Sequence, residues 1–68
     1  MKFNIEYEQE EDGRWLAEVL DLPGVLAYGR TIEEATSRVQ ALALRVLADR
    51  VEQGEVRPSL VTISFAAI

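Results

Sequence analysis

The sequence predicts an α+β fold of two layers, in which a mixed four-stranded sheet carries a single helix on one face. Two observations predict it: several short segments of alternating apolar and polar residues, and one long amphipathic segment with capping signals at both ends. Together they give the element order β-β-β-α-β. With 68 residues, the chain has room for a single domain spanning residues 1–68.

Three strands are predicted before the helix. Residues 3–8 and 15–20 alternate apolar and polar side chains, which is typical of half-buried strands. Between them, Asp12-Gly13 is a strong signal for a hairpin turn. Pro23-Gly24 fits the centre of a type II turn, because Pro presets φ and Gly supplies a positive φ. Residues 25–28 then form a short third strand.

The helix is predicted between Thr31 and Gly54. The segment Thr31-Ile32-Glu33-Glu34 is a capping box, in which the Thr31 hydroxyl accepts from the Glu34 amide and the Glu34 carboxylate accepts from the Thr31 amide. The two glutamates also place negative charge at the positive end of the helix dipole. Gly54 fits the left-handed position that follows the last turn of many helices.

The predicted helix carries two apolar bands when it is drawn at about 100° per residue. The main stripe, which we expect to face the core, contains Ile32, Ala35, Val39, Leu42, Ala43, Val46 and Leu47. A second band in the C-terminal half contains Ala41, Leu44, Ala48 and Val51. Because one stripe suffices to cover a sheet, the second band either packs under a neighbouring strand or forms an interface between copies of the chain.

A fourth strand, residues 60–65, is predicted after a loop at residues 55–59. A helix of about 22 residues is about 33 Å long, so it returns the chain along the whole sheet and the fourth strand runs parallel to the first. The connection is expected to be a right-handed crossover. Placing the fourth strand beside the first lets the helix cover the middle of the sheet, which gives the spatial strand order 3-2-1-4.

A fold of two layers leaves the other face of the sheet without a helix. By alternation this face, called the open face below, carries Asn4, Glu6, Glu8, Leu16, Glu18, Leu20 and Tyr28. One interpretation is a solvated surface with a few apolar side chains. The other is a binding face, on which leucine and tyrosine supply contact area and the carboxylates select a basic partner.

Composition narrows the possible partners. The chain has no Cys and no His, so a disulfide is impossible and an ordinary zinc or copper site is not expected. A domain this small is marginally stable alone, and oligomerisation is the remaining support, so we expect at least a homodimer. The net charge of −5 argues against direct nucleic-acid binding and against an anionic membrane surface.

The sequence also predicts location and the absence of catalysis. No apolar run approaches the roughly 20 residues of a membrane helix, and the N-terminus lacks a signal-peptide core, so the cytoplasm is the expected location. Without His or Cys, and without a nucleophile elbow or a phosphate-binding glycine motif, we expect neither an enzyme nor a cofactor. Carboxylates at residues 6–12 are of a type that binds Mg²⁺ or Ca²⁺, but solvated charge is the simpler interpretation.

Two segments resemble a known protein family. Residues 13–24 (GRWLAEVLDLPG) are similar to Gly-x-aromatic-x-Ala-x-x-Pro-Asp-Leu-Pro-Gly, a signature of HicB-type antitoxins, with Leu20 where the family often has Pro. Residues 29–35 (GRTIEEA) are similar to the Gly-x-Thr-x-Glu-Glu-Ala that follows in that family. The match covers most of residues 3 to 50, and it keeps the order and spacing of the two motifs.

The resemblance implies a partial RNase H-like fold and a role in a toxin–antitoxin system. Antitoxins of this family bind a small basic ribonuclease toxin and block its catalytic His. Many also carry a C-terminal DNA-binding domain that represses their operon, which this sequence does not include, so operator binding is not expected. The alternative is a stand-alone homo-oligomer with a structural or regulatory role.

The residues expected to bind a partner come from the acidic and apolar side chains of the first three strands and the hairpin. They are Glu6, Glu8, Glu10, Trp15, Leu16, Glu18, Leu20 and Tyr28. The carboxylates are expected to attract a basic nuclease, and the apolar and aromatic side chains are expected to occlude its active site.

Overall fold

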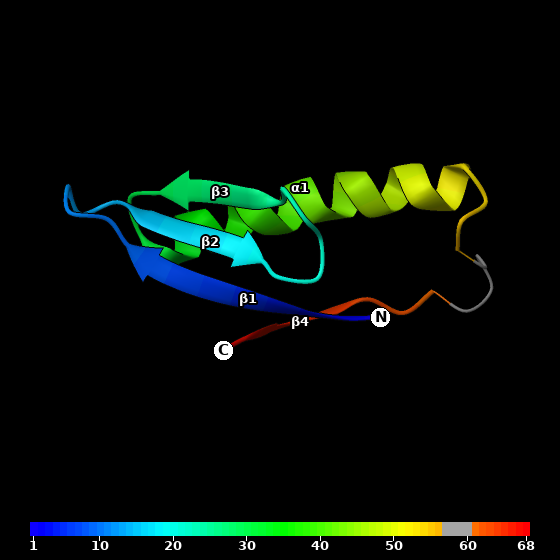
Figure 1. Ribbon diagram of the computed structural model, residues 1–68, viewed down its shortest axis with the longest axis horizontal. Helices are drawn as coiled ribbons and strands as arrows, with labels where there is room; N and C mark the ends of the chain where they lie inside the picture. Colours follow the sequence, from blue (N-terminus) through cyan, green and yellow to red (C-terminus); the bar gives the residue numbers. More distant parts are fainter. Residues whose placement is uncertain (57–60) are drawn as a thin grey trace.

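The computed structural model describes residues 1–56 and 61–68, and this part of the chain contains four strands and one helix (Figure 1). The elements are β1 (Lys2–Gln9), β2 (Trp15–Val19), β3 (Leu26–Gly29), α1 (Ile32–Glu52) and β4 (Ser64–Ala67). The strands lie in the order β3-β2-β1-β4, with the helix on one side of the sheet. β1 pairs antiparallel with β2 and parallel with β4, so the predicted mixed sheet and its strand order are confirmed.

Both predicted turns are present. In the hairpin, Gly13 has a φ of 92° and its N–H donates to the Glu10 carbonyl at 2.9 Å. In the second turn, Gly24 has a φ of 82°, and the Val25 N–H donates to the Leu22 carbonyl at 3.1 Å, as a type II turn requires. These two local structures return the chain twice and bring the first three strands side by side.

The fourth strand begins later than predicted. The pattern predicts a strand at residues 60–65, whereas β4 is Ser64–Ala67. Because its pairing with β1 begins at Lys2, residues 61–63 precede the ladder and are not part of a strand. The predicted start of the strand and most of the predicted loop, residues 57–60, lie outside the described residues.

The helix begins at the predicted cap. The Glu34 N–H donates to Thr31 Oγ1 at 3.0 Å, which is the first half of the capping box. The Glu34 carboxylate accepts from the Arg30 N–H at 3.0 Å and not from the Thr31 N–H, so the second half differs from the prediction by one residue. This hydrogen bond satisfies an amide in the short connection between β3 and the helix.

The helix ends at the predicted glycine. Gly54 has a φ of 78°, and its N–H donates to the Val51 carbonyl at 3.1 Å. The Glu55 N–H donates to the Arg50 carbonyl at 2.9 Å. These two bonds form a Schellman motif, which satisfies carbonyl groups that the last turn of a helix leaves without partners.

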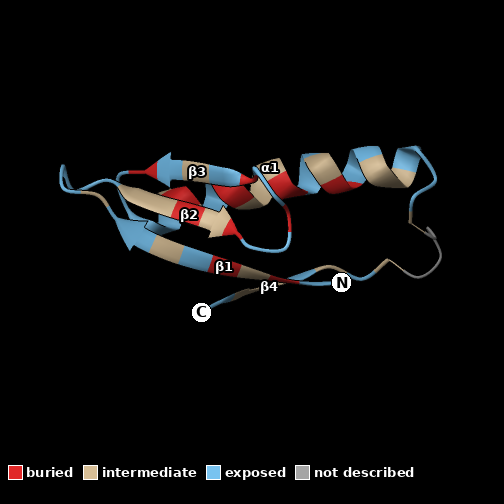
Figure 2. Ribbon diagram, viewed as in Figure 1, coloured by how far each residue is buried: buried red, intermediate tan, exposed pale blue. Residues whose placement is uncertain are grey.

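The hydrophobic core lies between the helix and the sheet (Figure 2). Its buried side chains are Phe3, Ile5, Ala17, Val19, Leu22, Val25, Ala35, Val39, Ala43 and Leu47. Leu42 and Val46 of the predicted main stripe are half-buried and pack against this core. Ile32 is 38 % exposed, contrary to the prediction, because it is the first residue of α1 and lies at the margin of the core.

The topology argument predicts a helix over the middle of the sheet, but the helix lies to one side of it. It packs mainly against β2 and β3. The close approach occurs at Gly29 of β3, where a side-chain Cβ would lie 2.3 Å from the backbone N of Ala35. A hydrogen bond of 2.6 Å between the Tyr7 hydroxyl and Thr36 Oγ1 connects the other flank of the helix to β1.

The sideways position of the helix leaves its second apolar band without a strand beneath it in the described part of the chain. Leu44 is 45 % exposed and Ala48 is also exposed, while Ala41 and Val51 are half-buried (Figure 2). The sequence leaves two interpretations open for this band, and the described part of the chain shows no strand that packs over Leu44 and Ala48.

Candidate functional site

The open face is built from three strands whose pairing sets its side chains in rows. One row runs from Glu8 through Leu16 to Tyr28, and the next runs from Glu6 through Glu18 to Leu26. Asn4 and Leu20 form a third, shorter row, since the Leu20 N–H donates to the Asn4 carbonyl at 3.1 Å. Because side chains alternate across a strand, all of these residues share the face opposite the helix.

The open face is acidic along β1 and apolar along β3. Glu6 and Glu8 are exposed on β1, whereas Leu26 and Tyr28 of β3 are 41 % and 38 % exposed. Leu20, just after β2, is 46 % exposed. The face therefore combines a carboxylate margin with an adjoining area of uncovered apolar surface, which is the composition of a binding patch.

The structure brings together most of the residues predicted to bind a partner, but not all of them. Six lie on the open face: Glu6, Glu8, Leu16, Glu18, Leu20 and Tyr28. Glu10 lies beyond the end of β1, in the hairpin. Trp15 is separate from them, because it pairs with Gly29 and packs half-buried against the core on the helix side.

Leu26 belongs to the open face, although it is not among the residues predicted to bind a partner. It alternates with Tyr28 in β3 and lies opposite Glu18. The signal was available in the period-two pattern of the third predicted strand. Arg14 is a second such residue, since it precedes β2 with the same alternation as Leu16.

Two glutamates of the open face oppose each other directly. Glu6 and Glu18 are cross-strand partners in the antiparallel ladder of β1 and β2. Like charges at directly opposite positions destabilise a sheet. The isolated domain therefore retains a locally unfavourable charge pair on this face, and a cationic group of a partner would relieve it.

We expect Glu6→Gln to raise the free energy of unfolding by about 0.2–1 kcal/mol, because it removes one charge from this pair. The measurement is urea unfolding at low and high salt, where screening should shrink the gain. Glu8→Gln is the matched control: it is exposed on the same strand but faces Leu16, so its effect should be close to zero. Equal effects of the two variants would contradict the opposed-charge interpretation.

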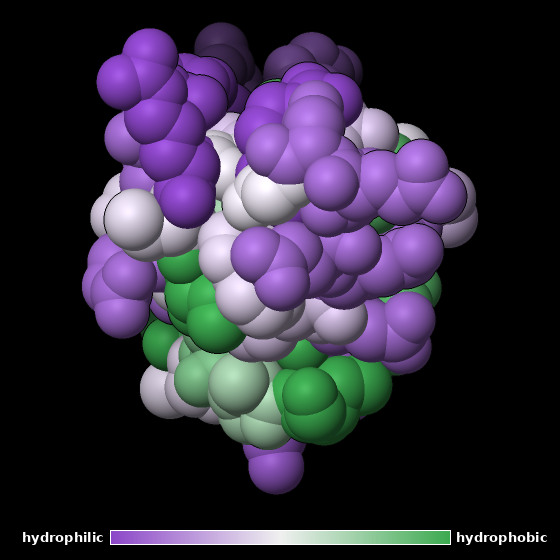
Figure 3. Space-filling view, turned by 90° about the vertical axis from the view of Figure 1, so that its left-hand side faces the viewer, coloured by the Kyte–Doolittle hydropathy of each residue, from purple (hydrophilic) through white to green (hydrophobic). Residues whose placement is uncertain are grey.

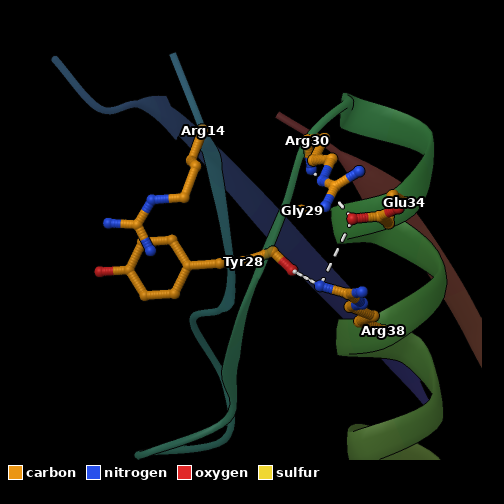
Figure 4. Close-up of a pocket in the computed structure, with 6 residues that line it drawn as sticks. All are labelled: Arg14, Tyr28, Gly29, Arg30, Glu34 and Arg38. Atoms are coloured by element: carbon orange, nitrogen blue, oxygen red, sulfur yellow. Dashed lines mark hydrogen bonds and ion pairs between the residues drawn. The ribbon is translucent and has the colours of Figure 1, made fainter. Parts of the chain in front are cut away.

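A hollow of about 440 Å³ adjoins the apolar side of the open face and bends around β3 (Figure 4). It is lined by Arg14, Tyr28, Gly29, Arg30, Glu34 and Arg38. The Arg14 guanidinium lies 4.5 Å from the centre of the Tyr28 ring, a cation–π contact. Arg38 donates to the Tyr28 carbonyl at 3.0 Å from the helix side.

The positive charge of this hollow is largely balanced by the chain itself. Arg14 forms an ion pair of 2.7 Å with Asp12, and Arg38 forms one of 3.4 Å with Glu34. Two of the three arginines are thus already paired, which weakens the case for an anion site. Their main effect is to hold the Tyr28 ring and its backbone in place.

The hairpin beside the open face is strongly acidic, with Glu8, Glu10, Glu11 and Asp12 around a second hollow. The pKa of Asp12 lies below its ordinary value, chiefly because its carboxylate accepts from the Arg14 backbone N–H and then from the Arg14 side chain. Asp12 therefore remains ionised at neutral pH. Within residues 1–56 and 61–68, no three carboxylates converge as they would around a metal ion.

Comparison with known proteins adds no assignment for this surface. No protein-family model, curated protein or solved structure matches the chain. Among the described residues, no helix has both the length and the apolar composition needed to cross a membrane.

Proposed function

We propose that this chain is a non-enzymatic protein-binding module, most specifically an antitoxin of the HicB type that binds and inhibits a small basic ribonuclease toxin. The observation that carries the proposal is the open face, where exposed apolar side chains adjoin a carboxylate margin on a surface that no helix of the described chain covers. The resemblance of residues 13–24 and 29–35 to the HicB signature supplies the class of partner.

The carboxylates of the open face would act first, during encounter. Glu6, Glu8 and Glu18 lie on adjacent strands, and Glu10 extends the acidic surface into the hairpin. Charges arranged in this way accelerate association with an oppositely charged protein and fix its orientation. The unfavourable Glu6–Glu18 pair gives a cation of the toxin an additional reason to bind there.

The apolar side chains would then exclude water from the contact. Leu20, Leu26 and Tyr28 present the largest exposed apolar groups of this face, and the Arg14 guanidinium lies over the Tyr28 ring. Tyrosine and arginine are common anchors of binding energy at protein interfaces. In this mechanism inhibition is steric: the toxin's active site is covered, and no residue of this chain performs chemistry.

The test is co-expression with a candidate toxin, the small basic protein encoded by the adjacent reading frame. We expect the two proteins to copurify, and we expect this chain to restore growth that the toxin arrests. If the proteins form no complex and growth is not restored, the antitoxin proposal is wrong.

A charge-reversal pair locates the contact on the open face. We expect Glu6→Lys with Glu18→Lys to weaken toxin binding about 10- to 100-fold and to reduce its salt dependence, because buried interfacial charges of the wrong sign cost several kcal/mol. Asp49→Lys with Glu52→Lys makes the same change in net charge on exposed positions of the helix and should weaken binding far less. Calorimetry or surface plasmon resonance measures both, and equal losses would place the contact elsewhere.

The alternative is a homo-oligomer that has a structural or regulatory role and no toxin partner. One specific observation favours it: Leu44 and Ala48 on the helix are exposed in the described part of the chain. A protein of this size also gains most of its additional stability by association. An isolated chain that sediments as an oligomer and captures no basic nuclease would support this alternative.

A further inference from the structure

The outer edge of β4 is the exposed margin of the sheet on the side of the C-terminus. The Ser64 N–H donates to the Met1 carbonyl at 2.9 Å, and the Ile68 N–H donates to the Ile5 carbonyl at 3.0 Å. Because successive residues of a parallel strand alternate in the direction of their N–H and C=O groups, those of Phe65 and Ala67 point away from β1. In the described part of the chain, β4 has no second strand neighbour.

The opposite edge of the sheet is protected, whereas nothing in residues 1–56 and 61–68 covers the β4 edge. At β3, Arg38 occupies the outward carbonyl of Tyr28, and the helix packs against the strand. β4 has no charged residue and no proline, and residues 61–68 are uncharged throughout. Proteins usually guard a free strand edge with charge, proline or a covering element, because an unguarded edge pairs with another chain.

The side chains around this edge are apolar. Ile68 is 67 % exposed, and Ile63 and Phe65 are half-buried at the margin of the core. Figure 3 shows apolar atoms gathered in the lower part of the molecule, the level at which β4 and the C-terminus lie in Figure 1. The edge therefore offers backbone hydrogen bonds and apolar contact at the same place.

We propose that β4 pairs antiparallel with β4 of a second copy of this chain across a twofold axis. The two four-stranded sheets then form one continuous sheet, and the apolar side chains beside each edge, Ile63, Phe65 and Ile68, lie near the seam. Two antiparallel copies of one strand are self-complementary, as a twofold interface requires. This inference rests on the homo-oligomer considered above and not on a toxin partner.

Charge favours the β4 edge as the contact between two copies, and the area that a stable dimer needs shows which side chains must take part. Each copy carries a net charge of −5, so two acidic open faces would repel each other, whereas the uncharged β4 edge permits close approach. A stable dimer needs about 800 Å² from each partner, which is about a sixth of the 4702 Å² surface of this chain. A strand edge of four residues is too small alone, so the apolar side chains of Ile63, Phe65 and Ile68 are required to complete the interface.

The test compares proline at two adjacent alanines. Ala67→Pro removes an outward N–H and is expected to raise the dimer dissociation constant about 10- to 100-fold, since each dimer loses two symmetric hydrogen bonds. Ala66→Pro is the matched control, because the alternation of β4 directs its N–H to β1; this variant should instead destabilise each chain. Sedimentation velocity across the micromolar range measures association, and circular dichroism monitors the fold.

A second variant keeps the test decisive if proline disrupts folding. Ala67→Lys leaves the backbone intact and places like charges across the twofold axis, so it should also weaken the dimer. In the native chain, hydrogen exchange at the Phe65 and Ala67 amides should slow as protein concentration rises. A chain that stays monomeric at high micromolar concentration contradicts both the pairing of β4 and the homo-oligomer. A dimer that survives Ala67→Pro and Ala67→Lys contradicts the pairing of β4 alone.

Discussion

Gly29→Ala is expected to lower the free energy of unfolding by about 3 kcal/mol, the upper range for overpacking a core. A Cβ at this position would lie 2.3 Å from the Ala35 N and 2.9 Å from both the Ala35 Cα and the Glu34 carbonyl carbon. All three are backbone atoms of the helix, so no side-chain rotation relieves the clash. The first turn of the helix would have to move away from β3, although Ala35 is fully buried.

This loss would be a large fraction of the total free energy of unfolding, because a domain of this size is stable by only about 3–10 kcal/mol. Urea unfolding followed by circular dichroism measures the change. Gly54→Ala is the control: no atom lies within 4 Å of the added Cβ, but the φ of 78° costs about 1 kcal/mol for a residue with a side chain. If Gly29→Ala costs no more than Gly54→Ala, the close contact between helix and strand is not a constraint.

Leu47→Ala is expected to cost about 2–5 kcal/mol, while Leu44→Ala should cost about 0.5 kcal/mol in the monomer. Both leucines lie on the same helix, three positions apart, and both changes remove the same atoms. They differ in burial: Leu47 is 2 % exposed in the core and Leu44 is 45 % exposed. The cost at Leu47 is large because the surrounding side chains would leave a cavity in place of the missing methyl groups.

The free energies of unfolding of the two variants must be measured at a protein concentration where the chain is monomeric. At higher concentrations the proposed dimer should stabilise the native state of the wild type and of both variants by mass action. Equal effects of the two variants in the monomer would contradict the packing described above, in which Leu47 lies in the core and Leu44 lies on the surface.

The parts of the fold that short-range interactions specify were predictable from the sequence. The Thr31 cap, the Gly54 terminus and the two turns each depend on a few neighbouring residues with special conformational preferences. Alternation in the first two strands also assigned Glu6, Glu8, Leu16 and Glu18 to one face. The strand order then followed from the length of the helix and the need to bring the fourth strand back parallel to the first.

The function of this chain does not follow from the fold. That this chain binds a basic nuclease, or associates with itself, remains a prediction, because a fold of this kind does not determine its partner. What the structure adds is geometry: it joins Leu26 and Arg14 to the open face and separates Trp15 from it.

The sequence by itself determined where the helix and the first three strands form and how they connect. Only the tertiary structure decided how the layers sit on one another. Periodicity identifies which side of an element is apolar, but the sideways position of the helix depends on how closely its first turn approaches β3, at Gly29 and Ala35. Leu44 is exposed in this arrangement, and pairing with β1 decides where β4 begins. Neither result is encoded in a local pattern, because each depends on backbone atoms that only the folded chain brings together.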